Sequence, residues 1–172
     1  MRLHIVLVEP EIPANTGNIS RTCSVIGAPL HLVHPLGFDI SEKQVKRAGL
    51  DYWDELELFE YNSFGEVRQK YPGGDFYYCT TKAPRAYADV DFTDGGQGDG
   101  KEVFLVFGKE TRGLPETLLA SNYEKCIRIP MKVNKRSLNL SNSVAVIAFE
   151  VLRQFGFENL EKQGRLTGRA EG

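Results

Sequence analysis

The sequence predicts an α/β protein: a mostly parallel β-sheet flanked by helices. Several short apolar runs are separated by helix-like segments, a pattern typical of strands that helices cover on both faces. These runs repeatedly end in polar or glycine-rich loops, and open parallel sheets bind ligands at that end of their strands. Three of these strand exits, after Thr80, Phe107 and Ile129, would converge along one edge of the sheet. The chain of 172 residues is 41% hydrophobic, enough to bury one core without disulfides or metal.

The first predicted strand spans residues 3–8, an apolar and largely branched run. The next segment, residues 9–17, contains two prolines and a glycine, which indicate a loop at the carboxyl end of this strand. We expect Thr16 or Asn18 to cap a helix that ends at Gly27.

Three polar side chains, Asn15, Asn18 and Arg21, are expected at or near the amino-terminal end of that helix. Free backbone amides and a guanidinium would together hold an anion there. Composition alone favours a second interpretation for Arg21, a solvated arginine on the surface.

Further strands are expected over residues 30–33, 56–61, 76–80 and 103–107, and helices over residues 41–49 and 64–71. The helix at 41–49 would be basic, with Lys43, Lys46 and Arg47. Residues 95–100 read as a surface loop. We expect one domain over residues 1–157 and a flexible tail over 158–172.

A glycine turn follows the fifth strand, from Gly108 to Pro115. A phosphate-binding P-loop needs lysine after its second glycine, but Leu114 stands there, so this nucleotide motif is excluded. The turn would let a ligand approach the backbone at Gly108, with Glu110 and Arg112 beside it. An ordinary turn with a surface ion pair fits the same residues equally well.

The segment from Cys126 to Val151 combines a short strand, a polar loop and a helix. Its strand stops at Pro130, and Ser141 is expected to cap a helix whose inward stripe is Val144, Ile147, Ala148 and Val151. Between them, Asn134, Ser137, Asn139 and Asn142 offer donors and acceptors. These side chains could hold a polar ligand, or they could cap the helix and satisfy the loop's own backbone.

Composition limits the classes of function. A net charge of −2 predicts no strong general attraction to nucleic acid, so RNA contact would need a local basic patch. Three scattered cysteines without a CxxC pair favour reduced thiols and argue against a zinc site. The apolar run at the amino terminus is too short for a signal or a membrane span, which predicts a cytoplasmic protein without a membrane partner.

Three ordered motifs together resemble those of the SPOUT methyltransferases, in the branch that methylates tRNA ribose 2′-hydroxyls. They are Asn15-x5-Arg21; Gly108-x-Glu110-x-x-Gly113-Leu114; and Ile129-Pro130-Met131 followed by Ser137-Leu138-Asn139-Leu140-Ser141-Asn142-Ser143. The opening EPEIPANTGNISRTC, the AGLDYW segment and TTK are similar to the narrower group of tRNA (cytidine/uridine-34)-2′-O-methyltransferases. The resemblance covers residues 3–157.

The resemblance implies a C-terminal trefoil knot, a homodimer, a tRNA substrate and S-adenosyl-L-methionine as cofactor, with no metal. It implies that leucine tRNAs are the substrates. The cofactor-binding residues it implies are Cys79, Gly108, Ile129, Met131, Ser137 and Leu138. The catalytic residues it implies are Arg21, Asn15, Glu110, Ser137 and Asn139.

Arg21 would act on the ribose hydroxyl or an adjacent phosphate, and the other catalytic residues would hold geometry. A guanidinium is a poor proton acceptor, so we favour a phosphate clamp over a general base. The phosphate contacts are expected from Lys43, Lys46, Arg47, Lys82, Lys135 and Arg136. Two alternatives stay open: an enzyme for another tRNA or rRNA position, and a non-catalytic RNA-binding module with the same fold.

Overall fold

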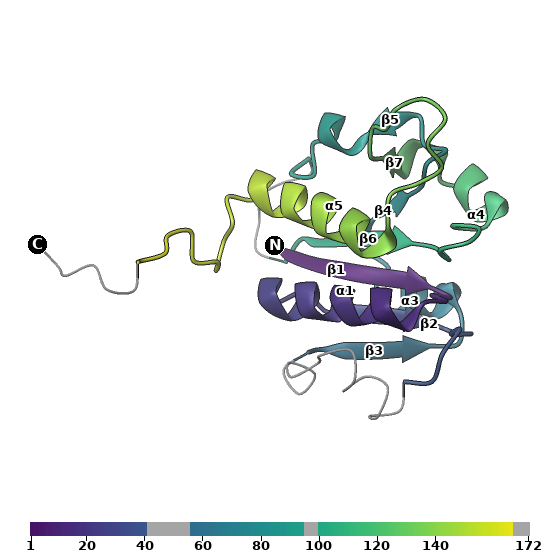
Figure 1. Ribbon diagram of the computed structural model, residues 1–172, viewed down its shortest axis with the longest axis horizontal. Helices are drawn as coiled ribbons and strands as arrows, with labels where there is room; N and C mark the ends of the chain where they lie inside the picture. Colours follow the sequence, from purple (N-terminus) through teal and green to yellow (C-terminus); the bar gives the residue numbers. More distant parts are fainter. Residues whose placement is uncertain (41–55, 95–99, 167–172) are drawn as a thin grey trace, which may run out of the picture.

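A computed structural model describes residues 1–40, 56–94 and 100–166. One seven-stranded sheet carries helices on both faces (Figure 1). The strands are β1 (Arg2–Val8), β2 (Leu30–Val33), β3 (Leu58–Tyr61), β4 (Asp75–Cys79), β5 (Arg85–Ala86), β6 (Glu102–Phe107) and β7 (Cys126–Arg128). The α-helices are α1 (Pro13–Ile26), α3 (Phe64–Lys70), α4 (Glu116–Ala120) and α5 (Leu140–Gln154), with 3₁₀ turns η2 (Tyr87–Asp89) and η3 (Tyr123–Lys125).

The strand order is β3-β2-β1-β6-β4-β7-β5, and every strand pair is parallel. This confirms the predicted parallel α/β class. From β1 the chain builds outward through β2 to β3 and then fills the other side, starting with β4. The boundary between β1 and β6 is therefore a topological switch point, where open α/β sheets bind ligands at the carboxyl ends of the strands.

Strand β1 is buried on both faces, which explains its nearly continuous apolar sequence. Leu3, Ile5 and Leu7 belong to the core under α1 and α5, whereas Val6 and Val8 belong to the core on the opposite face. Because successive strand residues point to opposite faces, one strand supplies both cores.

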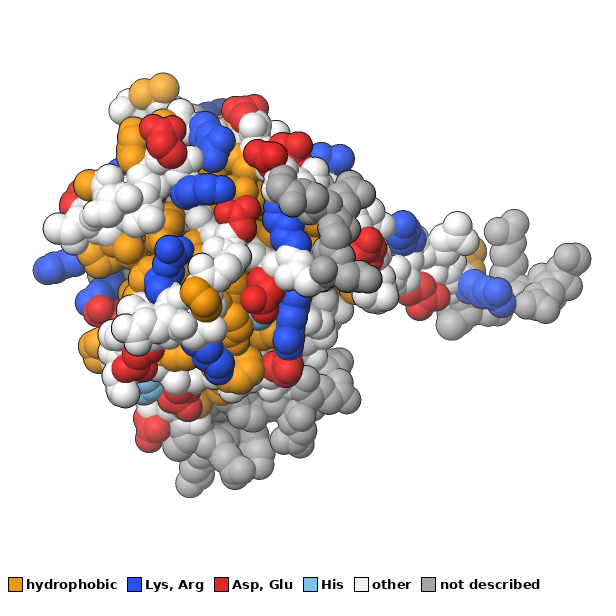
Figure 2. Space-filling view, turned by 180° about the vertical axis from the view of Figure 1, so that it is seen from behind, with side chains coloured by type: hydrophobic (Ala, Val, Ile, Leu, Met, Phe, Trp, Pro, Cys, Tyr) orange, Lys and Arg blue, Asp and Glu red, His pale blue; other side chains and the backbone are white. Residues whose placement is uncertain are grey.

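The second face combines aromatic rings with basic side chains. Arg68 lies over the ring of Phe76, at 4.4 Å from its centroid, and Lys70 lies over Phe59 at 4.3 Å. Seen from this side, Lys and Arg side chains are interspersed with acidic and hydrophobic ones (Figure 2). Cations over ring faces are held by the ring quadrupole while their charge stays in water.

Two fully buried histidines, His4 and His31, lie in the core on this second face. His4 Nδ1 is 2.9 Å from His31 Nε2, and His31 Nδ1 is 3.1 Å from the hydroxyl of Tyr61. Burial, followed by the charge of Arg2, lowers the pKa of His4 to about 4. Burial likewise lowers the pKa of His31 to about 3. Both rings are therefore neutral at pH 7 and form part of the core.

Helix α1 begins earlier than the sequence suggested, so the predicted caps Thr16 and Asn18 are wrong. The helix starts at Pro13, and its N-cap residue Ile12 has no side-chain cap. Proline is well suited to the first helical turn because its fixed φ is helical and its missing N–H needs no partner there. The predicted end at Gly27 is confirmed, with a left-handed φ of 66°.

Helix α5 is capped by Asn139 and not by the predicted Ser141. The carboxamide oxygen of Asn139 accepts from the backbone amides of Ser141 at 2.9 Å and Asn142 at 3.3 Å. The inward stripe is confirmed, because Val144, Ile147, Ala148 and Val151 are all buried.

The other strands and the helix predicted within the described residues are confirmed with small shifts. The third strand begins at Leu58, two residues later than predicted, and the helix after it ends at Lys70. The predicted basic helix at 41–49 and most of the 95–100 loop lie outside the described residues. Residues 158–166 contain no helix or strand. The flexibility of the tail and the single domain over 1–157 stay predictions.

Candidate active site

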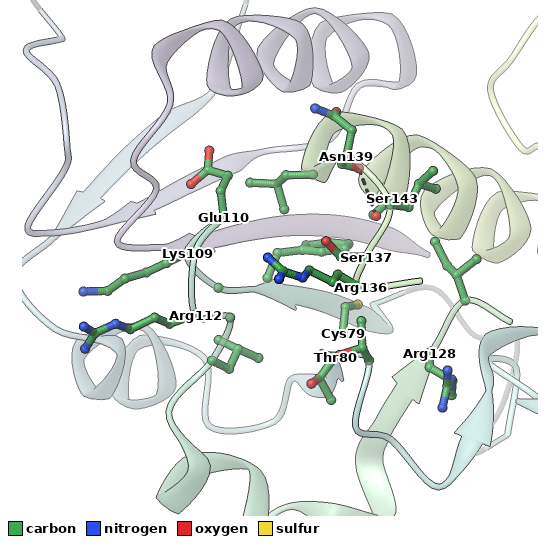
Figure 3. Close-up of a pocket in the computed structure, with 18 of the residues that line it drawn as sticks. Cys79, Thr80, Lys109, Glu110, Arg112, Arg128, Arg136, Ser137, Asn139 and Ser143 are labelled. Carbon is green, nitrogen blue, oxygen red and sulfur yellow. Dashed lines mark hydrogen bonds between the residues drawn. The ribbon is translucent and has the colours of Figure 1, made fainter. Parts of the chain in front are cut away.

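A hollow of about 620 Å³ lies at the carboxyl ends of β4, β6 and β7 (Figure 3). These strands are adjacent in the sheet, in the order β6-β4-β7. The sequence predicted that three strand exits, after Thr80, Phe107 and Ile129, would converge at one edge of the sheet, and all three contribute to the wall. The hollow has the size typical of small-molecule sites.

Nearly all of the site residues implied by the sequence meet in this pocket. Its wall includes Asn15, Cys79, Gly108, Glu110, Ile129, Met131, Ser137, Leu138 and Asn139. They come from α1, from the strand exits and from the loop before α5. Segments far apart in sequence thus form one surface, as the three motifs require.

Arg21 does not line this pocket. Because α1 starts at Pro13, Arg21 lies well inside the helix and its side chain is exposed. The expectation that it lies at the amino-terminal end of the helix is therefore wrong.

The amino-terminal end of α1 is already occupied by a carboxylate of the protein. Glu110 accepts hydrogen bonds from the backbone amides of Glu11 at 2.7 Å and Ile12 at 3.1 Å. It also accepts one from the side-chain amide of Asn15 at 3.0 Å. Free amides at a helix start attract anions, so Glu110 caps α1 from a distant loop. The predicted anion site for a ligand is thus filled by Glu110.

Asn15 links this cap to the second helix of the site. Its carboxamide oxygen accepts from the side-chain amide of Asn139 at 3.0 Å, and its nitrogen donates to Glu110. Asn139 in turn caps α5. The chain of bonds Glu110–Asn15–Asn139 therefore joins all three motifs and fixes the two helix ends relative to the turn after β6.

A reciprocal contact closes the same junction. The carboxylate of Glu11 accepts from the hydroxyl of Thr111 at 2.7 Å and from its backbone amide at 3.1 Å. The hydroxyl bond from Thr111 is the main cause that lowers the pKa of Glu11 below its usual value. Glu11 is therefore ionised at neutral pH, and the two loops are tied in both directions.

Gly108 is required by the turn itself, in addition to the predicted approach of a ligand, which stays a prediction. A Cβ at this position would lie 2.2 Å from the backbone carbon of Gly113 and 2.3 Å from the backbone nitrogen of Leu114. No side chain fits, because the turn folds back on its own start. The glycine therefore makes the turn possible, a reason that the sequence did not indicate.

Cys79 contributes an apolar wall and no nucleophile. Burial raises the pKa of its thiol well above the usual value, so the thiol stays protonated. Its strand pairs with β7 through Ile127, another wall residue.

Several wall residues were not proposed as site residues from the sequence. They are Ile12, Phe107, Thr111, Ile127, Arg128, Leu140, Ser143 and Ile147. Ile127 and Arg128 belong to the predicted strand that stops at Pro130, so their position near a strand exit was the available signal. Ile12 has no such signal, because it reaches the pocket only through the early start of α1.

Metal binding has no obvious location in the described chain. Residues 1–40, 56–94 and 100–166 contain no group of three or more His, Cys, Asp or Glu side chains arranged to hold a metal ion. In the same ranges, no helix has the length and apolar character needed to cross a membrane.

The fold and the site define a parallel α/β protein whose pocket is assembled from three strand-exit loops beside a topological switch point. The family model described as "SpoU rRNA Methylase family" matches residues 2–149, and the chain belongs to this family. A relative from Listeria innocua is 56% identical over 90% of this chain and 89% of its own length. One from Aeromonas hydrophila, named tRNA (cytidine(34)-2′-O)-methyltransferase, is 44% identical over 90% of this chain and 96% of its own length.

Solved structures agree with this assignment. One, described under "Structural insights into the 2-OH methylation of C/U34 on tRNA", superposes with a TM-score of 0.81 at 39% identity. It covers 91% of this chain and 98% of its own. An AdoMet-bound rRNA methyltransferase from Sinorhizobium meliloti superposes with a TM-score of 0.74 at 26% identity, covering 88% of this chain and 56% of its own.

Proposed function

We propose that this chain transfers a methyl group from S-adenosyl-L-methionine to the ribose 2′-hydroxyl of nucleotide 34 in tRNA. One observation carries the proposal. The Glu110–Asn15–Asn139 bonds hold the three motifs of the family around one pocket of about 620 Å³. The Aeromonas hydrophila relative, whose name states this reaction for cytidine 34, matches 90% of the chain.

The pocket residues fit the proposed cofactor. Apolar residues such as Leu114 and Ile127 form part of the wall, and polar residues such as Thr80 and Ser137 line it as well. A purine nucleoside needs this combination of apolar surface and a few placed polar groups. When bound, the cofactor supplies an electrophilic methyl group on a sulfonium. Cys79, Gly108, Ile129, Met131, Ser137 and Leu138 are the proposed cofactor-binding residues.

The described residues of the pocket act by orienting the two reactants. Asn15 is hydrogen-bonded to Glu110 and to Asn139, and these two residues also bond to helix ends, so all three hold geometry. Ser137 is exposed at the pocket wall and can contact a substrate directly. Positioning of two reactants can supply about 7–11 kcal/mol of a barrier in the best cases.

Arg21 is proposed to clamp a phosphate beside the acceptor hydroxyl. Because Arg21 does not line the pocket of its own chain, it would meet the substrate at the outer surface of that chain. Arg21→Lys keeps the charge and should retain part of the single-turnover rate, whereas Arg21→Ala should lose nearly all of it. If Arg21→Ala transfers methyl groups at the wild-type rate with saturating tRNA, Arg21 has no part in the reaction.

In a homodimer formed through α1 and α5, Arg21 would lie at the subunit interface. Helices α1 and α5 lie side by side on one face (Figure 1). Their exposed large side chains include Val25, at 63% exposure, and Phe149, at 44%. Val25 is four residues after Arg21 and so shares its side of α1. Light scattering at micromolar concentration should give the mass of two chains, and a monomer alone would contradict the dimer.

We also infer the C-terminal trefoil knot. Strand β7 lies beyond β4 in the sheet, yet α5 returns to pack on α1, β1 and β6. Pulling the chain by its ends provides a test. Residues inside a tightened knot do not add to the end-to-end length. The fully extended length should therefore be shorter than that of an unknotted chain, which is about 3.3–3.6 Å per residue. A full-length extension would exclude the knot.

Leucine tRNAs are the proposed isoacceptors and the cytoplasm is the proposed location. Mapping ribose methylation in tRNA from cells with and without the gene tests the substrate. Loss of the modification at nucleotide 34 of leucine tRNAs is the expected result. Loss at another position, or on a base, would refute the assignment to nucleotide 34. Calorimetry should show about one cofactor site per chain.

A further inference from the structure

A second hollow of about 250 Å³ lies on the other side of the turn after β6. Lys82, Lys109, Arg112, Gly113 and Leu114 line both hollows and so form a wall between them. Glu9, Pro115 and Glu116 contribute to the second hollow alone. Lys109 and Arg112 extend together away from Cys79 and Ser137 (Figure 3).

The charges of this hollow are incompletely balanced. Lys82 forms an ion pair with Glu116, and Lys109 forms one with Glu9. In the part of the chain that the structure describes, Arg112 makes neither an ion pair nor a hydrogen bond. The lining therefore holds three cations and two carboxylates, and Arg112 is exposed. A third carboxylate, Glu11, is close enough that Lys109 and Arg112 help to lower its pKa, but its hydrogen bonds go to Thr111. The guanidinium donors of Arg112 thus stay available to a ligand.

The backbone at Glu9 is also unusual. Its φ of 52° lies in the left-handed region, which non-glycine residues seldom adopt. Such strain persists where the surrounding structure enforces it and is concentrated at functional sites. Here it places the partner of Lys109 at the exit of β1, directly at the wall of the second hollow.

We propose that this hollow binds a phosphodiester of the RNA next to the acceptor nucleotide, with Arg112 as the principal ligand and Lys82 and Lys109 beside it. The inference rests on the proposed function. Arginine presents a planar fork of donors that matches two phosphate oxygens, whereas lysine acts as a point charge. Because the cations also line the methyl-donor pocket, a phosphate held there places the adjoining ribose at the mouth of that pocket.

The first experiment pairs a protein change with a change of one phosphate. Anticodon stem-loop RNA is prepared with a single uncharged methylphosphonate at either linkage that flanks nucleotide 34, and Kd is measured by fluorescence anisotropy. Arg112→Gln should weaken binding of unmodified RNA about tenfold, as expected for a charged hydrogen bond, and flatten the salt slope by about 0.7. At one of the two linkages, the methylphosphonate should weaken RNA binding by the wild type about as much. The Kd of Arg112→Gln for RNA should be the same with and without that methylphosphonate. Additive losses at both linkages would overturn the proposal.

The matched control is Arg68→Gln. It removes the same charge from α3, outside both hollows. Its Kd should stay within about twofold of the wild type, since only the general charge has changed. Equal losses in Arg112→Gln and Arg68→Gln would show a charge effect without a site. If the wild type neither binds the cofactor nor methylates tRNA, the proposed function fails. If it does both and Arg112→Gln matches Arg68→Gln, only the phosphate site fails.

A change of opposite sign tests the carboxylates. Glu116→Gln releases Lys82 and should tighten RNA binding, by more than Glu161→Gln does in the exposed tail. Equal effects of the two changes would contradict the inferred role of Lys82. Pyrophosphate supplies the last arm. In one outcome, the wild type binds pyrophosphate with a submillimolar Kd, and Arg112→Gln loses this binding but keeps the wild-type affinity for RNA. That result would assign the hollow to a free phosphate and overturn its assignment to RNA.

Discussion

Replacing Glu110 with alanine removes three hydrogen bonds from the junction of the three motifs. Two of the donors are backbone amides at the start of α1, and the third is the side-chain amide of Asn15. A lost helix cap costs about 0.5–2 kcal/mol, and hydrogen bonds to charged groups contribute about 1.5–3 kcal/mol each. Glu110 is only half-buried, so water compensates part of the loss, and we expect about 2–4 kcal/mol in total.

Glu110→Gln should cost less, about 1–2 kcal/mol. In the native protein Oε1 accepts from Ile12 and Asn15, and Oε2 accepts from Glu11. A glutamine has one acceptor oxygen, so its amide nitrogen must face at least one of these donors. The order of stability should therefore be Glu, Gln, Ala.

Urea denaturation followed by circular dichroism measures these free energies of unfolding at a fixed protein concentration, since a dimer would make them concentration-dependent. For a chain of this length, 2–4 kcal/mol corresponds to a fall in Tm of about 4–16 °C. Glu161→Ala is the control, since Glu161 is exposed in the tail. If Glu110→Ala unfolds within about 0.5 kcal/mol of Glu161→Ala, the cap does not stabilise the junction, and the reasoning is refuted.

Asn139→Ala should lower the free energy of unfolding by about 0.5–2 kcal/mol, because the α5 cap is lost. Asn139→Asp keeps the accepting oxygen and should lower it by less. Equal losses would contradict the capping role. Gly108→Ala should lower Tm sharply because its Cβ meets backbone at 2.2 Å, while Gly164→Ala, with open space, should not; similar Tm values would show that the turn can relax. The lowered pKa values of His4 and His31, about 4 and about 3, predict stability that is full above pH 6.5 and is lost as pH falls toward 4, with a slope of up to about 1.4 kcal/mol per pH unit for each histidine. Urea unfolding at pH 7, 6 and 5 checks the slope, and a flat profile would contradict the buried neutral pair.

Much of the fold could be predicted because it follows from local patterns. The strand of residues 3–8 is apolar on both faces since helices cover both, and that alone indicates a parallel sheet. The convergence of the three strand exits follows from parallel strands sharing one edge. The order of the strands could not be predicted, because it depends on pairing between distant segments.

The errors lie at helix ends, where long-range contacts decide. Pro13 was read as part of a loop, although proline also starts helices, and only the distant carboxylate of Glu110 satisfies the amides there. Ser141 was preferred to Asn139 as a cap because both residue types cap well, and their three-dimensional neighbours distinguish them. Arg21 was misplaced by the same shift of the helix start.

The central claim is that this pocket transfers a methyl group to the 2′-hydroxyl of nucleotide 34. The most direct measurement uses labelled S-adenosyl-L-methionine under single-turnover conditions with two leucine tRNAs, one unmodified and one carrying 2′-deoxycytidine at position 34 only. The unmodified tRNA should accept about one methyl group per molecule, and the 2′-deoxy tRNA should accept none while binding with similar affinity. Label in the 2′-deoxy tRNA, or no label in either tRNA, would contradict the account.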